Sequence, residues 1–118
     1  MLDKDLFDKK IEQSIEKFAE RVKDWDKTDL LSQKEEIELK INELELDINF
    51  NRKLIQKFKN YPKKRRQFLK YNFENDYDLR KLDCEKNIME FRQTIRQHEI
   101  AILFYTAQIM YLNDLLKE

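Results

Sequence analysis

The sequence contains no glycine, and only one proline and one cysteine among its 118 residues. Glycine is the usual residue where the backbone needs a positive φ or approaches a ligand closely. Its absence excludes the glycine-rich loops that hold phosphate groups and dinucleotides. It also disfavours tight β-hairpins and favours long helices. A single cysteine cannot form an intramolecular disulfide, which suits a reducing compartment.

Long apolar runs are also missing. The first residues are charged from Asp3 onward and contain no apolar signal core. The most apolar stretch, 100–112, is about half the ~20 residues that a membrane span needs, and it contains Thr106 and Gln108. We therefore expect a soluble, cytoplasmic protein without a membrane partner.

Charge is abundant but unevenly distributed. The 24 basic and 24 acidic residues give a net charge of zero. Residues 1–47 carry 9 basic and 15 acidic side chains, residues 48–73 carry 9 basic and none acidic, and residues 74–118 carry 6 and 9. The central basic block is therefore the informative feature of the charge pattern.

Apolar residues recur at alternating steps of four and three in three parts of the chain. This spacing is the signature of a helix that lays one seam against another helix along its length. The predicted seams are Phe7, Ile11, Ile15, Phe18, Val22 and Trp25; Ile37, Ile41, Leu44, Ile48, Asn51, Ile55 and Phe58; and Cys84, Ile88, Phe91, Ile95, His98, Ile102, Tyr105, Ile109, Leu112 and Leu116.

Local signals place the helix ends. Ser32 and Glu35 have the spacing of a capping box, in which each side chain accepts a hydrogen bond from the other residue's backbone N–H. Pro62 is expected to end a helix, because it lacks the N–H donor and pushes the preceding residue out of the helical region. The predicted helices span approximately 3–25, 33–60, 63–71 and 76–117.

These features predict one all-α domain over residues 1–118. Short connections favour antiparallel neighbours. The last helix would be roughly 60 Å long at 1.5 Å per residue, whereas a compact globule of this size is very roughly 35 Å across. We therefore expect an elongated antiparallel bundle of three long helices, with coiled-coil-like 4-3 seams and one short helix.

Two helices carry apolar residues beyond their seams. The second long helix has a further stripe at Leu39, Leu46 and Phe50, which predicts that it is sandwiched between two partners. The last helix is apolar on nearly all sides, which predicts a homodimer built on its uncovered face. The predicted oligomer interface consists of Ile95, Ile100, Leu103, Phe104, Ala107, Met110 and Tyr111.

Catalysis is not expected. The simplest nucleophile and base, Cys84 and His98, lie 14 residues apart on one predicted helix, which separates them by about 21 Å along its axis. The only histidine has Ile95, not an acid, three residues before it, so the Glu-x-x-His motif of di-iron bundles is missing. We expect no catalytic residue, metal site, cofactor or small-molecule substrate.

The central basic block carries the functional prediction. Such a cluster can neutralise phosphates, bind an acidic protein surface, or be neutralised by acidic residues of the chain itself. We predict a non-enzymatic adaptor, inhibitor or regulator, for example of a phage or mobile element, that docks on a macromolecule. A sequence-nonspecific nucleic-acid binder and a purely structural oligomerisation module remain alternatives. The predicted binding residues are Arg52, Lys53, Lys57, Lys59, Lys63, Lys64, Arg65, Arg66 and Lys70.

Overall fold

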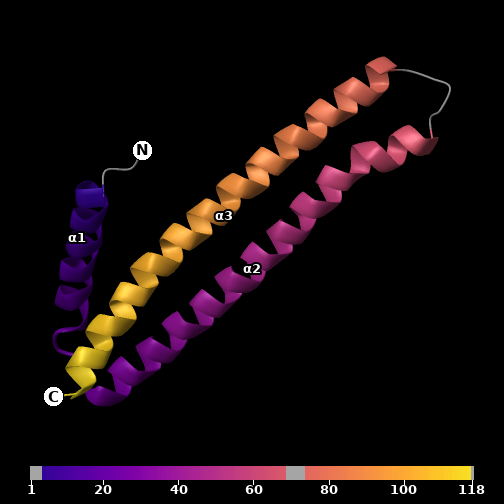
Figure 1. Cartoon of the computed structure of the whole chain (residues 1–118). Helices are drawn as coiled ribbons and strands as arrows, with labels where there is room; N and C mark the ends of the chain where they lie inside the picture. The colour runs from indigo at the N-terminus through magenta and orange to yellow at the C-terminus, as the bar shows by residue number, and fades with distance from the viewer. Residues whose placement is uncertain (1–3, 69–73, 118) are drawn as a thin grey trace. The chain divides into compact units, whose positions relative to one another are not determined.

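The computed structural model describes the backbone of residues 4–68 and 74–117, and the side chains of residues 5–60 and 82–117. Its helices are α1 (Lys4–Val22), α2 (Lys27–Phe68) and α3 (Glu74–Lys117) (Figure 1). The described backbone contains no strand, and the helices pack against one another, which confirms the predicted all-α bundle. No helix within these ranges combines the length and the apolarity that crossing a bilayer requires.

The second helix begins earlier than predicted. The backbone N–H of Asp29 donates to Asp26 Oδ1 at 2.8 Å, and that of Leu30 donates to the Asp26 carbonyl at 3.0 Å. Asp26 is therefore the N-cap residue, because its side chain satisfies a donor that the first turn leaves unpaired. The capping box predicted at Ser32 and Glu35 instead lies inside α2. The sequence analysis did not identify Asp26 as a cap and therefore placed the start of this helix too late.

The predicted break at Pro62 and the separate short helix over 63–71 are wrong, because α2 continues to Phe68. Residues 69–71 lie outside the described part of the chain. A proline inside a helix removes one hydrogen bond and crowds the preceding turn, at a cost of about 3 kcal/mol, and it can kink a helix without ending it. The lysines and arginines on its C-terminal side are good helix formers and favour continuation.

Contacts divide the chain into two compact units. Unit 1 comprises Met1–Leu44 and Glu99–Glu118, and unit 2 comprises Glu45–His98. Within each unit, α2 and α3 run in opposite directions (Figure 1). The prediction of a single domain over the whole chain stays a prediction.

Unit 1 contains all three helices around one apolar core. Its buried members are Phe18, Val22, Leu30, Ile37 and Leu112. All of these except Leu30 are predicted seam positions, and Leu30 lies before the predicted start of the second helix.

In unit 1, α1 packs on α3 and not on α2 alone. The ring of Phe7 lies edge-on to Phe104 with centroids 5.8 Å apart, and Phe18 meets Tyr111 in the same way at 6.1 Å. From the other side, α2 contacts α3 where Lys40 Nζ lies 5.8 Å from the Tyr105 ring centroid. Within this unit α3, rather than α2, is the helix between two partners.

Unit 2 is an antiparallel pair formed by the second half of α2 and the first half of α3. Phe58 and Phe91 pack with ring centroids 5.5 Å apart. Asn51 is buried in the seam, and its side-chain Nδ2 donates to the Asp47 carbonyl at 2.8 Å. The predicted seam is confirmed by its buried apolar members, which are Ile48, Ile55, Cys84, Ile88 and Ile95.

Candidate functional site: the exposed side of α2

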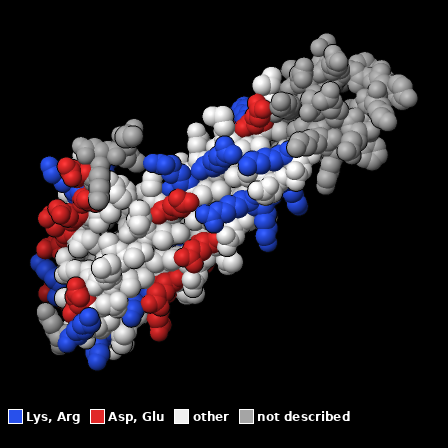
Figure 2. All heavy atoms as spheres, in the orientation of Figure 1, with Lys and Arg blue, Asp and Glu red and all other residues white. Residues whose placement is uncertain are grey.

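Four of the predicted binding residues have described side chains, and all four are exposed on α2 in unit 2. They are Arg52, Lys53, Lys57 and Lys59. On the face drawn in Figure 2, Lys and Arg side chains gather over α2 and α3 in unit 2. The side chains of Lys63, Lys64, Arg65 and Arg66 and the whole of Lys70 lie outside the described residues.

Lys53, Lys57 and Lys59 form no ion pair with an acidic residue in the part of the chain that the structure describes. An ion pair joins Lys23 to Glu20 at 2.7 Å, and Asp47 contacts His98. No acidic residue lies between 48 and 60 on α2 itself, so Lys53, Lys57 and Lys59 have no acidic neighbour within this stretch of the helix.

A row of exposed side chains runs along α2 on the side away from its seam, and we call it the outward row. Its members follow one another at steps of four, three, four, three and four, so they share one helical face. All of them are exposed, in contrast to Ile48 and Ile55 on the seam. The outward row consists of Leu39, Glu43, Leu46, Phe50, Lys53 and Lys57.

The exposure of this row corrects the expectation that the second long helix is covered on two sides. Leu39, Leu46 and Phe50 are 62%, 70% and 58% exposed. In unit 1, where Leu39 lies, α1 places its aromatic side chains on α3 instead. The sequence reasoning identified this apolar stripe and the lysines separately, but not that they continue one another on a single face.

Unit 2 also exposes apolar side chains on α3. Leu82 and Met89, seven residues apart, are each 61% exposed. On α2, a shallow hollow is lined by Arg52, Lys53, Ile55 and Gln56. The unit thus presents cationic, amide and apolar groups together, which suits a mixed macromolecular surface.

The predicted oligomer interface is only partly available. Ile95 is buried in the seam of unit 2, whereas Phe104 and Tyr111 pack on α1 in unit 1. Ile100 and Ala107 are half-buried. The apolar seam of α1 must pack against another apolar surface. This requirement could have predicted that α1 covers the side of α3 that carries Phe104 and Tyr111. Exposed side chains remain at Leu103 and Met110, so self-association through this face stays a prediction.

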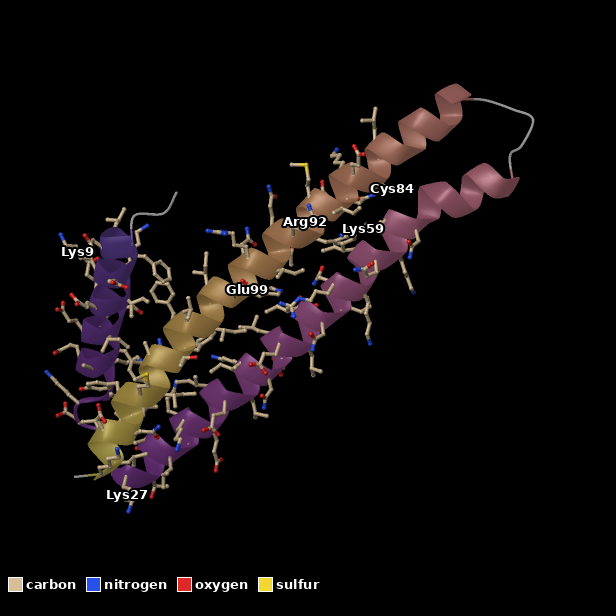
Figure 3. The ribbon with its side chains drawn as sticks, viewed as in Figure 1. Lys9, Lys27, Lys59, Cys84, Arg92 and Glu99 are labelled. Carbon is tan, nitrogen blue, oxygen red and sulfur yellow. The ribbon has the colours of Figure 1, made fainter. Side chains whose placement is uncertain are left out.

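Cys84, which Figure 3 labels, and His98 lie 14 residues apart on the continuous helix α3, as expected. Burial, and secondarily the negative charge of Asp83, raises the pKa of the Cys84 thiol. A thiol that stays protonated is a poor nucleophile. His98 instead contacts α2, where its Nε2 lies 2.5 Å from Asp47 Oδ2. Among the described residues, no group of three or more His, Cys, Asp or Glu side chains is placed to hold a metal ion.

No protein-family model, curated protein or solved structure matches this chain. What the candidate site can bind therefore follows from its own residues. The site presents exposed ammonium groups and apolar side chains, which favour binding of a macromolecule over catalysis.

Proposed function

We propose that this chain is a non-enzymatic helical binding protein, an adaptor or inhibitor acting in the cytoplasm. It docks on an acidic protein surface through the basic segment of α2, by which we mean residues 52–59 with their exposed Lys and Arg side chains. The observation that carries this proposal is that Lys57 and Lys59 are exposed without an ion pair in the described part of the chain, although the chain holds as many acids as bases. Unneutralised cations of this kind steer an acidic partner toward their surface and help to fix its orientation.

Exposed apolar groups in the same unit favour a protein partner over nucleic acid. Binding to a phosphate backbone is driven mainly by cations and by the release of counterions. Leu82 and Met89 gain nothing from such a backbone, whereas a protein surface can bury them. A regulator that blocks a host complex, carried by a phage or mobile element, is one concrete form of this function.

Sequence-nonspecific nucleic-acid binding is the second candidate. It is supported by the run of nine basic residues without an acid in 48–73. Capture from native cell lysate, with and without nuclease, separates the two candidates. A complex that survives nuclease treatment supports the protein partner, and one that disappears supports nucleic acid.

A matched pair of variants tests the surface itself on the purified partner. We expect Lys57→Glu with Lys59→Glu to weaken binding at least tenfold, since two attractive contacts become repulsive. Lys9→Glu with Lys10→Glu, on α1, makes the same charge change at exposed positions and should leave affinity unchanged. Equal affinity of both variants would contradict the proposal. Light scattering on each variant separates lost partner binding from altered self-association.

A further inference from the structure

We infer that the outward row of α2 is a self-complementary seam, on which a second copy of this chain packs in the antiparallel direction. The row belongs to one continuous helix, Lys27–Phe68, so the order of its residues follows from the helical repeat alone. The inference goes beyond the proposed function, because the partner here is the chain itself.

The spacing of the row is that of a helix–helix seam. From Leu39 to Lys53 the steps alternate between four and three, as they do on the buried side of the same helix. Its apolar members, Leu39, Leu46 and Phe50, are all more than half exposed. Single exposed apolar residues are ordinary on a protein surface, but a row in seam register indicates a helical partner.

The charges on the row indicate that its partner is a second copy of the chain and that this copy packs in the antiparallel direction. Glu43 precedes the central pair Leu46 and Phe50, and Lys53 follows it, each one step away. An antiparallel copy places Leu46 opposite Phe50 and Glu43 opposite Lys53, and the two-fold symmetry forms each contact twice. A parallel copy would set Glu43 against Glu43 and Lys53 against Lys53, which like-charge repulsion disfavours.

The two charged residues are available for these contacts. Both side chains are exposed, and neither has an ion pair in the part of the chain that is described. In the antiparallel pair each charge meets an opposite charge beside the apolar centre, which fixes the register as polar seam residues do in coiled coils. In the same register Lys57 lies opposite Leu39 of the second copy, whereas Lys59 lies off the row and stays open to the proposed partner.

The charge pattern supplies a test by exchange. Glu43→Lys and Lys53→Glu should each weaken self-association at least tenfold, because each variant turns two attractive contacts into repulsive ones. An equimolar mixture of the two variants should associate again, since a Glu43→Lys chain facing a Lys53→Glu chain recovers both attractive contacts. The measurement is light scattering across micromolar concentrations, starting from the 14.7 kDa monomer.

Controls keep folding and charge separate from the interface. Both substitutions are at exposed positions, so circular dichroism should show unchanged helix content. Glu38→Lys, exposed on α2 but off the row, should associate like the wild type. A wild type that stays monomeric, or a mixture that associates no better than its components, would overturn the inference. A monomer that still binds its acidic partner would leave the proposed function intact.

Discussion

The Cys84 thiol lies in the seam of unit 2, where burial raises its pKa. We expect iodoacetamide to alkylate it more slowly than an unstructured cysteine peptide at pH 8, because less thiolate forms. The unfolded thiol ionises near its ordinary value of 9.0, while the folded thiol stays neutral to higher pH. This contribution to the free energy of unfolding is therefore complete below pH 9 and is lost as pH rises beyond it.

Mass spectrometry of the alkylated chain against pH measures this reactivity. The peptide serves as the reference, and the chain in denaturant serves as the unfolded control. Alkylation of the native chain at the rate of the denatured chain would show that the thiol is not protected by the seam.

A buried and an exposed leucine allow the assignment of core and surface to be tested by single substitutions. Leu112 is fully buried in unit 1, whereas Leu46 is 70% exposed. We expect Leu112→Ala to lower the free energy of unfolding by about 2–5 kcal/mol, through lost burial and the cavity that remains. Leu46→Ala, the matched control, should change it by less than about 0.5 kcal/mol when the chain is measured as a monomer. Denaturant titration followed by circular dichroism gives both values, and equal losses would contradict the assignment of the core.

At the scale of the helices, Asp26 decides where α2 begins. Its side chain accepts a hydrogen bond from the Asp29 backbone N–H at 2.8 Å. We expect Asp26→Ala to cost about 1 kcal/mol of stability, since the donor in the first turn loses its partner. Asp24→Ala, also exposed, is the control for charge and should cost little. If the two variants lose the same stability in thermal unfolding, Asp26 is not the cap.

The sequence predicted the helices better than their ends. The 4-3 rows identified all three seams, because burying one face along a whole helix imposes that period. The seam position of Asn51 was also predicted correctly. Its buried side-chain amide donates a hydrogen bond to the Asp47 carbonyl of the same helix. The prediction that the helix ends at Pro62 was wrong, because the preference of one residue was outweighed by the helix formers around it. The start of α2 was predicted too late because only the spacing of Ser32 and Glu35 was interpreted as a cap, whereas Asp26 accepts the hydrogen bond from the Asp29 backbone N–H.

For the whole molecule, the sequence located the basic segment but not the neighbours of each helix. Charge counting identified Lys57 and Lys59, because a stretch without acids cannot neutralise itself within one helix. The side of α3 that carries Phe104 and Tyr111 was assigned to a second chain, although α1 covers it. Apolar surface shows that a partner is needed, while the choice between the same chain and another depends on tertiary packing.

The salt dependence of partner binding, measured for the wild type and for Lys57→Glu with Lys59→Glu, tests whether the basic segment of α2 is the docking surface. Exposed charges are screened within about 10 Å at 0.1 M salt, so wild-type affinity should fall steadily as salt rises. For a protein partner the fall should be shallower than the slope of about −0.9 per phosphate that duplex DNA gives. The variant should bind weakly, and salt should change its affinity much less. A wild-type affinity that does not change with salt would contradict the assignment of the basic segment of α2 as the docking surface.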